Sequence, residues 1–309
     1  MPTNLGEKPI GPGAGAARTA SASDQSAAAM LVGRVLPHDL FAGRTVFVTG
    51  GSSGINLAVA RNFAALGARI AICGRSAERL EAATADLREV GDEVRGYQAD
   101  VRDYAALETA FNRTVAELGR LDVLVCGAAG NFRCRAEDLS PNGFKTVVDI
   151  DLLGSFYACR AAFEHLRRTR GSIIFISAGQ AYLPFAMQVH AGAAKAGMDN
   201  LMRNLALEWG HYGIRCNSIV PGPIAGSGGI AKVSEEVVRE GLLKATALGR
   251  LGTGDDIGQA AVFLASPLAS YITGARIDVD GGINLEGSAP LRKATEADFP
   301  RRYEVVPPL

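Results

Sequence analysis

Short apolar runs alternate with amphipathic stretches along most of this chain, and that alternation limits the folds open to it. Each run is too short for a helix and mostly apolar at consecutive positions, which is typical of strands buried on both faces. The runs are TVFVTG (45–50), ARIAIC (68–73), EVRGYQAD (93–100), LDVLVC (121–126), SIIFIS (172–177), IRCNSIV (214–220) and RIDVDGG (276–282). Strands that alternate with helices form a parallel sheet covered on both faces. We therefore expect a doubly wound α/β sheet of about seven strands, flanked by helices.

The same pattern predicts how the chain is divided. Nothing between residues 42 and 283 has the composition of a linker, so we expect a single domain over 41–284. Residues 1–40 are rich in Ala, Gly and Ser and are expected to form a flexible arm, or else to pack on a partner subunit. Residues 285–309 form a proline-containing tail. The expected helices include long ones over 141–169 and 190–211 and a shorter one over 234–247.

Composition excludes several classes of partner. The 309 residues contain 32 Lys and Arg against 32 Asp and Glu, so no net charge favours nucleic acid or a membrane surface. No apolar run approaches the roughly 18 residues that span a bilayer. The five cysteines are scattered and form no CxxC pair, which indicates neither a metal site nor a disulfide framework. Free thiols suit a reducing compartment.

A glycine-rich segment, TGGSSGIN (49–56), connects the first expected strand to the first helix. Glycines at this turn let the backbone approach a pyrophosphate closely, and the helix N-terminus that follows offers unpaired N–H groups. Between a strand and a helix, at the start of an alternating domain, this segment predicts a Rossmann-type dinucleotide site rather than an ordinary turn. The residues expected to bind the cofactor here are Gly50, Ser52, Ser53, Gly54 and Ile55.

Three motifs together carry a family resemblance. The spacing TGxxxGI, the ADV at 99–101 and the GAAGN at 127–131 resemble the short-chain dehydrogenase/reductase family over roughly residues 42–283. The resemblance implies that the adenine and the cofactor cleft are contacted by Asp100, Val101, Ala128, Ala129 and Gly130. It also implies that PGPI (221–224), with Pro221, Gly222 and Ile224, lies beside the nicotinamide. Asn56 departs from the pattern, which usually has a glycine there, and should only tighten helix–strand packing slightly.

The end of the second strand favours NADP(H) over NAD(H). NAD-binding proteins usually place a carboxylate there to accept hydrogen bonds from the ribose hydroxyls. Here no acid occurs from residue 68 to 77, and Arg75 occupies the region. A guanidinium is suited to a 2′-phosphate because it is permanently charged and can bind in a bidentate manner. The alternative is a solvated arginine that opens the next helix.

The family's usual catalytic set of Asn, Ser, Tyr and Lys is largely replaced. The Asn position falls on Asp151, the Ser position on or near Ala178, and the Tyr position on Ala191, while Lys195 remains. A methyl group cannot exchange a proton, so ordinary ketone reduction through a tyrosine is not expected. The new carboxylate, Asp151, is placed where it could pair with Lys195.

One branch of the family is similar in its departures as well as in its shared motifs. AAGNF (128–132), FKTVVDID (144–151), QVHAGAAKAG (188–197), LALEWG (205–210) and VPGPIAG (220–226) resemble the 2,4-dienoyl-CoA reductases, especially the peroxisomal type. That resemblance implies NADPH-dependent reduction of dienoyl-CoA thioesters in unsaturated fatty acid degradation. Asp151 and Lys195 would act with a water, because the final proton goes to carbon rather than to oxygen.

The resemblance extends to the substrate and to assembly. It implies that Phe132, Ser140 and Asn142 contact the acyl-CoA, and Lys232 either meets a CoA phosphate or is solvated. It also implies a homotetramer. The chain ends in PPL, which is not a peroxisomal address, so we expect a cytoplasmic protein.

Alternatives remain open at this point. They are a trans-2-enoyl-CoA reductase, another short-chain oxidoreductase, and a non-catalytic protein that senses NADP(H). His190 is either a proton donor or a polar residue at a helix start, and Tyr182 either reaches the cleft or serves packing.

Overall fold

The computed structural model describes residues 35–228 and 241–288 and shows one seven-stranded parallel sheet. The strand order is β3-β2-β1-β4-β5-β6-β7, with every neighbouring pair parallel. The strands are β1 (Thr45–Thr49), β2 (Arg69–Gly74), β3 (Val94–Gln98), β4 (Val123–Cys126), β5 (Ser172–Ile176), β6 (Arg215–Pro221) and β7 (Arg276–Val279). The expected fold class is confirmed, and each predicted run contains one strand.

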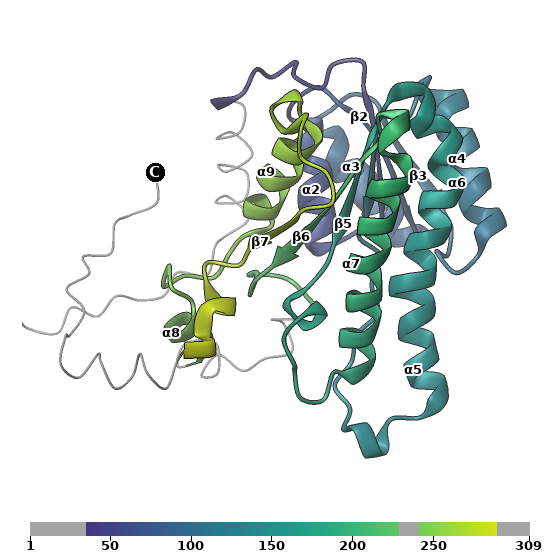
Figure 1. Cartoon of the computed structure of the whole chain (residues 1–309). Helices are drawn as coiled ribbons and strands as arrows, with labels where there is room; N and C mark the ends of the chain where they lie inside the picture. The colour runs from purple at the N-terminus through teal and green to yellow at the C-terminus, as the bar shows by residue number, and fades with distance from the viewer. Residues whose placement is uncertain (1–34, 229–240, 289–309) are drawn as a thin grey trace, which may run out of the picture.

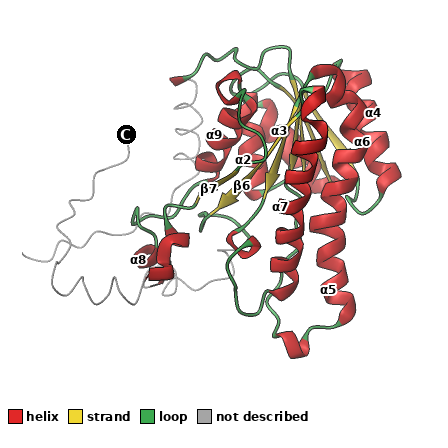
Figure 2. Ribbon diagram, viewed as in Figure 1, coloured by secondary structure: helices red, strands yellow, loops and turns green. Residues whose placement is uncertain are grey.

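Helices cover both faces of the sheet (Figures 1 and 2). On one face lie α2 (Gly54–Ala64), α3 (Ala77–Arg88) and α9 (Gly254–Ala265), whose apolar side chains form one core with the sheet. On the other face, α4 (Tyr104–Leu118), α6 (Gly154–Thr169) and α7 (Val189–Trp209) form a second core. In Figure 1 the pair α2 and α9 lies on the opposite side of the strands from α4 and α6.

The strands are apolar at consecutive positions because alternate side chains enter the two cores. In β1, Val46 and Val48 belong to the core beneath α2 and α9, whereas Phe47 belongs to the core beneath α4 and α6. All three are fully buried. A strand with one solvated face would alternate apolar and polar residues instead.

The strand order reverses beside β1, and this reversal places the functional cleft. The chain moves outward from β1 to β2 and β3, then returns to add β4 on the other side of β1. The loops that leave β1 and β4 therefore diverge toward opposite faces of the sheet. Such a switch point opens a crevice at the carboxyl ends of the strands, where α/β proteins bind their ligands.

The long helix expected over 141–169 contains an interruption that the sequence pattern did not predict. It comprises α5 (Pro141–Val148), a π-helical turn (Asp149–Leu153) and α6, which follows directly. A π turn inserts an extra residue into a helix and occurs often at functional sites. Gly154 follows it, and a Cβ atom there would lie 2.7 Å from Val101 Cγ2, so the turn packs closely against the β3–α4 loop. Asp151 lies in the middle of this turn.

Other expectations fall partly outside the described residues. Most of the helix expected over 234–247 does so, and only the short α8 (Leu243–Ala245) is seen in that region. Residues 1–34 of the expected arm and 289–309 of the expected tail also lie outside. Within the described part of the chain, none of the helices combines the length and apolar character needed to cross a membrane.

The helices α2 and α9 are joined by a buried polar contact. Asn62 Nδ2 donates a hydrogen bond of 2.7 Å to Asp255 Oδ1, and both residues are buried. Burial raises the pKa of the Asp255 carboxyl, and the hydrogen bond from Asn62 opposes part of that rise. Gly258 allows this close packing, since a Cβ atom there would collide with the Asn62 side chain.

We expect Asn62→Leu to destabilise the protein by about 1–3 kcal/mol, because it leaves the buried Asp255 carboxyl without its donor. The free energy of unfolding in urea measures this change. As a control, Asn204→Leu removes an exposed amide on α7 that bonds only to the Asn200 carbonyl of its own helix. Equal stability of the Asn62 variant and the wild-type protein would contradict the assigned role.

Candidate active site

A cavity of about 950 Å³ lies at the carboxyl ends of the strands. Its walls include Gly50 after β1, Arg75 after β2, Gly127 after β4, Ser177 after β5 and Gly222 after β6. Most residues predicted to bind the cofactor or act in catalysis meet here: Gly50, Ser52, Ser53, Gly54, Ile55, Arg75, Asp100, Val101, Ala128, Ala129, Asp151, Lys195, Pro221 and Gly222. Phe132, predicted to contact substrate, lines the same cavity.

The glycine-rich loop forms one end of the cavity. Gly50 has a φ of +68°, and a Cβ atom on it would lie 2.9 Å from Ala128 Cα. The helix α2 starts at Gly54, its N-cap Ser53 makes no side-chain cap bond, and its first turn carries no acidic residue. The first N–H groups of α2 thus remain available beside the cavity, as a pyrophosphate requires. This end of the site fits a dinucleotide.

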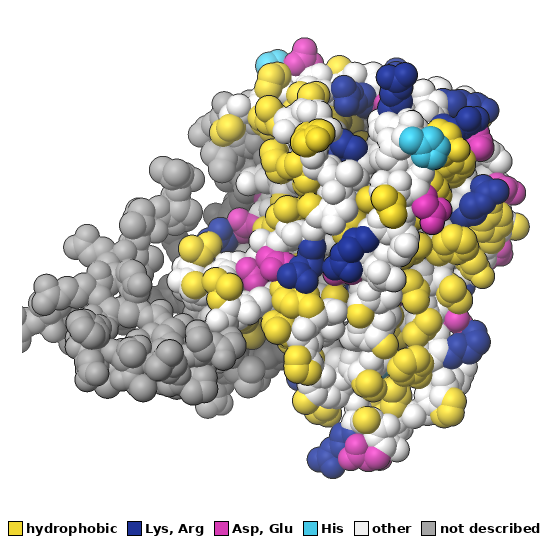
Figure 3. Space-filling view, in the orientation of Figure 1, with side chains coloured by type: hydrophobic (Ala, Val, Ile, Leu, Met, Phe, Trp, Pro, Cys, Tyr) yellow, Lys and Arg dark blue, Asp and Glu magenta, His cyan; other side chains and the backbone are white. Residues whose placement is uncertain are grey.

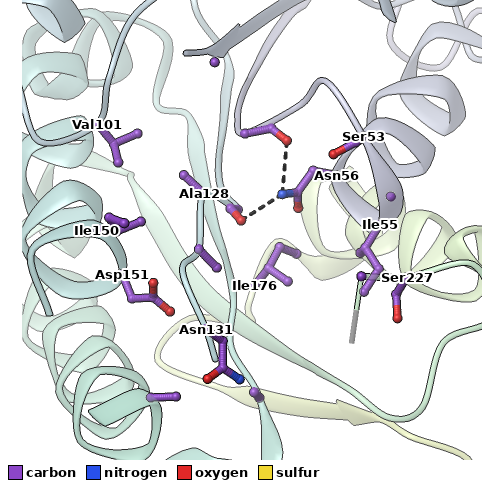
Figure 4. A pocket seen from close by; sticks show the side chains of 18 of the residues that line it. Ser53, Ile55, Asn56, Val101, Ala128, Asn131, Ile150, Asp151, Ile176 and Ser227 are labelled. Atoms are coloured by element: carbon purple, nitrogen blue, oxygen red, sulfur yellow. Dashed lines mark hydrogen bonds between the residues drawn. The ribbon is translucent and has the colours of Figure 1, made fainter. Parts of the chain in front are cut away.

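Asn56 ties two loops of the cavity together, a role that the sequence interpretation missed. Its Nδ2 donates to the carbonyl oxygen of Gly127 at 2.8 Å and lies 3.4 Å from that of Gly50 (Figure 4). A Cβ atom at Gly127 would collide with the Asn56 amide. The residue that replaces the usual glycine therefore links the β1–α2 loop to the loop after β4, instead of only adjusting helix packing.

Two arginines stand where the ribose of the cofactor is expected. Arg75 and Arg79 are exposed and line the cavity. Gln98 Nε2 donates to the Arg75 carbonyl at 2.9 Å, and Ser76 caps α3 by accepting from the Arg79 N–H. Arg79 was not predicted. The sequence offered one signal for it: Arg79 lies four residues after Arg75, in the first turn of a helix, a spacing that brings two side chains together.

Asp100 is held as a carboxylate at the same end. Arg102 donates to it from Nε at 3.0 Å and from Nη2 at 2.6 Å. These hydrogen bonds hold the pKa of the Asp100 carboxyl below its usual value. The bidentate contact fixes the loop after β3, from which Val101 also reaches the cavity.

The opposite end of the cavity contains a buried ion pair. Lys195 Nζ lies 3.3 Å from Asp151 Oδ2 and donates to the Ile176 carbonyl at 2.9 Å. The backbone N–H of Gly130 donates to Asp151 Oδ1 at 2.7 Å. Only 1% of Asp151 and 7% of Lys195 are exposed. The carboxylate and the ammonium therefore have fixed partners and still face the cavity, an arrangement suited to holding a water and moving its proton.

The positions of the usual tyrosine and serine carry methyl groups. Ala191 and Ala178 both line the cavity. The neighbouring hydroxyl of Ser177 is shielded from solvent and has no hydrogen-bond partner among the described residues. No side-chain hydroxyl replaces the missing tyrosine at these positions.

Some predicted residues lie elsewhere. Gly130 acts through its backbone, as described above, and Ile224 is buried beside a separate cavity of about 400 Å³. Ser140 caps α5 by accepting a 3.0 Å hydrogen bond from the Gly143 N–H, and Asn142 is exposed on that helix. Neither lines the large cavity. Lys232 falls outside the described residues.

Phe132 joins the substrate prediction to His190. A Cβ atom on Gly143 would lie 3.2 Å from Phe132 Cζ, so the ring packs beside the start of α5. The His190 ring is fully buried beneath it, with ring centroids 4.4 Å apart. Neither ring nitrogen of His190 has a partner within the described chain. His190 does not line the cavity.

Tyr182 also lies away from the cavity. Its hydroxyl accepts a 2.7 Å hydrogen bond from Asn284, and the Arg276 guanidinium stacks on its ring at 3.6 Å. Burial, together with the nearby Asp278 carboxylate, raises the pKa of Tyr182 to about 12. These contacts favour a packing role.

Three amide side chains that sequence reasoning did not assign also line the cavity. Asn131 and Gln180 each donate a 2.8 Å hydrogen bond to Gln188 Oε1. We call these residues the amide cluster. The sequence did not indicate this cluster, because Asn131 is far from Gln180 and Gln188 in the chain and only the fold brings the three together.

Comparison with known proteins finds a matching family model and similar reductases. A family model described as Enoyl-(Acyl carrier protein) reductase matches residues 50–284. The chain is 43% identical over 249 residues to a peroxisomal 2,4-dienoyl-CoA reductase of Saccharomyces cerevisiae, covering 79% of this chain and 85% of that protein. It is 43% identical over 243 residues to a probable 2,4-dienoyl-CoA reductase of Bacillus subtilis, covering 77% and 96%.

Two solved structures of short-chain dehydrogenases are also similar to this chain. A short chain dehydrogenase from Bacillus anthracis has a TM-score of 0.71 and 38% identity, covering 79% of this chain and 98% of that one. A putative short-chain alcohol dehydrogenase from Sinorhizobium meliloti has a TM-score of 0.76 and 32% identity, with coverage of 79% and 98%. With its parallel sheet, glycine-rich loop and retained lysine, the chain belongs to the short-chain dehydrogenase/reductase family.

Proposed function

We propose that this protein reduces 2,4-dienoyl-CoA thioesters with NADPH, in the degradation of unsaturated fatty acids. The observation that carries the proposal is the buried pair of Asp151 and Lys195 in a cavity where Ala191 replaces the tyrosine. This arrangement suits a reaction that ends with a proton on carbon. Relatives of 37–43% identity are named 2,4-dienoyl-CoA reductases, which agrees with this choice.

The cofactor proposal rests on the charges around Arg75. NADPH supplies a hydride when bound, and Ser52, Ser53 and the first N–H groups of α2 would hold its pyrophosphate. Arg75 and Arg79 would bind the 2′-phosphate, since two guanidiniums attract a dianion that a carboxylate would repel. Lys195 would also hold the nicotinamide ribose, as it does by resemblance in the family.

The chain's residues have distinct tasks in the reaction. When the conjugated substrate accepts a hydride at its far end, electrons move to the thioester oxygen and a dienolate forms. A donor must hold the negative oxygen, and an acid must deliver a proton to carbon. A water held between Asp151 and Lys195 would deliver that proton. No alcohol forms, so Ala191 is compatible with turnover.

Phe132 supports the acyl-CoA part of the proposal. Its ring is 40% exposed although it lines the cavity, which leaves apolar surface at the entrance for an acyl group. Ser140 and Asn142 are exposed at the start of α5, outside the cavity, and the Phe132 ring packs beside the same end of that helix. Of these three predicted substrate contacts, Phe132 is therefore the one that supports the proposal.

A homotetramer is proposed from one face of the molecule. Figure 3 shows apolar side chains gathered over α6 and α7, and the exposed apolar residues on α5 to α7 include Phe144, Phe156 and Leu207. Such a surface favours burial against a second copy. A mass of one chain in solution, measured by light scattering, would contradict the assembly.

The five cysteines are free thiols, which supports the cytoplasm as the proposed location.

A second candidate is a trans-2-enoyl-CoA reductase, favoured by the description of the matching family model. NADPH oxidation should be measured with matched dienoyl-, enoyl- and 3-oxoacyl-CoA thioesters of equal chain length. We expect the dienoyl thioester to turn over fastest and the 3-oxoacyl thioester to turn over poorly, because Ala191 offers no proton. Faster enoyl reduction would support the second candidate. Binding of NADPH without turnover of any thioester would identify a non-catalytic sensor.

Arg75→Ala should narrow the preference for NADPH over NADH at least tenfold. A charge-assisted contact with the 2′-phosphate is worth roughly 1.5–3 kcal/mol. Dissociation constants for both cofactors, measured by fluorescence titration, give the ratio. Arg113→Ala, which removes an arginine on α4 that pairs with Glu117, should leave the ratio unchanged. Equal affinity of the wild-type protein for both cofactors would refute the assignment.

Asp151→Asn should lower kcat for dienoyl-CoA by about 10²–10⁴-fold, since an amide cannot relay the proton. The affinity of this variant for NADPH should remain nearly unchanged. Lys195→Ala, in contrast, should lower both kcat and the affinity for NADPH. Asp149→Asn is the matched control, because Asp149 lies in the same π turn but pairs with Lys145 on its own helix. A near-native kcat for the Asp151 variant would remove this carboxylate from the mechanism.

A further inference from the structure

The amide cluster occupies the cavity wall near the ion pair. Asn131 comes from the loop after β4, Gln180 from the short 3₁₀ turn after β5, and Gln188 from the N-cap position of α7. Figure 4 places Asn131 on the same side of the pocket as Asp151, away from Asn56 and the glycine-rich loop. The cluster therefore belongs to the end of the cavity where the chemistry is expected.

The hydrogen bonds fix the direction of the Gln188 amide. Its Oε1 accepts from Asn131 Nδ2 and from Gln180 Nε2, both at 2.8 Å, and these two bonds occupy both lone pairs of the oxygen. The Gln188 Nε2 group donates to no residue in the described ranges 35–228 and 241–288. Donors aimed at an amide oxygen also polarise the amide and strengthen its own N–H groups. The Gln188 amide is thus held in a fixed orientation, and its N–H groups are stronger hydrogen-bond donors than those of an unpaired amide.

Gln188 stands at the N-terminal end of α7, the helix that carries Lys195. Gln188 directly precedes the first helical residue, Ala191 and Lys195 lie one turn apart on α7, and all three line the cavity. Side chains on a helix lean toward its N-terminus, so Lys195 leans toward Gln188 across the small Ala191. The Gln188 and Lys195 side chains thus line the same cavity, with Ala191 between them in the chain.

The donors closest in the chain to the ion pair are already engaged or shielded. Lys195 Nζ is paired with Asp151 and the Ile176 carbonyl. Ala178 and Ala191 have no polar side-chain atom, and the Ser177 hydroxyl has almost no accessible surface. Among the described residues of the β5–α7 segment that line this wall, Gln188 is the amide with both N–H groups uncommitted. A dienolate oxygen requires such a donor, because unpaired negative charge in a buried site is costly.

We propose that the Gln188 side-chain amide donates a hydrogen bond to the thioester oxygen and stabilises the dienolate, with Asn131 and Gln180 as positioning residues. This inference rests on the proposed function. Hydride addition at the far carbon converts the carbonyl into C–O⁻, and Gln188 Nε2 donates to that oxygen. The carbonyl re-forms when the water held by Asp151 and Lys195 protonates carbon. No bond forms between the substrate and the protein, and one hydride and one proton are consumed per turnover.

The substitution Gln188→Glu tests the donor most sharply. A carboxylate keeps the length of the side chain and still accepts from Asn131 and Gln180, but it cannot donate and its charge opposes the dienolate. We expect kcat for 2,4-hexadienoyl-CoA to fall about 10²–10³-fold, the range found when an oxyanion donor is removed. The dissociation constant for NADPH should stay within about twofold. Gln188→Met, which also lacks a donor, should show the same fall in kcat without added charge.

A spectroscopic readout separates the donor role from a structural one. The ultraviolet band of 2,4-hexadienoyl-CoA should move to longer wavelength when it binds the NADP⁺ complex of the wild-type protein, because a hydrogen bond to the carbonyl polarises the conjugated system. Both Gln188 variants should bind the thioester without this shift. Asn204→Asp, which changes an exposed amide on the same helix, should retain the shift and the native kcat.

The outcomes distinguish this inference from the proposed function. If the wild-type protein neither binds nor reduces the dienoyl thioester, the proposed function fails and the inference falls with it. If the wild-type protein reduces it but either Gln188 variant retains native kcat and the shifted band, the donor role is overturned while the function stands. Loss of both kcat and the shift in the two variants, with NADPH affinity preserved, supports the donor role.

Discussion

The ion pair between Asp151 and Lys195 is the interaction on which the site depends. Two charges with almost no exposed surface are stable only when each has close partners, because desolvation costs several kcal/mol per ion. Here the partners are the opposite charge, the Gly130 N–H and the Ile176 carbonyl. The loop after β4, the end of β5, the π turn and α7 must therefore be held in one arrangement around the pair.

The cavity has two ends with different electrostatic character. At one end, the glycine-rich loop and the first N–H groups of α2, with Arg75 and Arg79, present positive charge to an anionic cofactor. At the other end, the ion pair and the amide cluster face the region where the proposed reaction would develop negative charge. Asn56 links the β1–α2 loop to the Gly127 carbonyl, and the loop that begins there continues to Gly130, whose N–H holds Asp151.

The sequence predicted the fold because the signals are local. Consecutive apolar residues indicated the strands, and alternation with helical spacing indicated the parallel sheet. The pairing of Asp151 with Lys195 was predicted only through family resemblance, since 44 positions separate them. The π turn left no trace in the apolar pattern, as one inserted residue hardly changes helical spacing. The amide cluster and the Asn56 bridge depend on contacts between distant segments, such as Asn131 with Gln188, which a single sequence does not display.

The central claim is that a solvent-derived proton reaches carbon by way of Asp151 and Lys195, in place of a tyrosine that serves oxygen. One dienoyl-CoA turnover with unlabelled NADPH in D₂O, followed by mass spectrometry and NMR of the enoyl-CoA product, measures this directly. The account predicts one deuterium, bound to a carbon that did not receive the hydride. A product with no carbon-bound deuterium, or a hydroxyacyl product from a ketone substrate at a comparable rate, would contradict it.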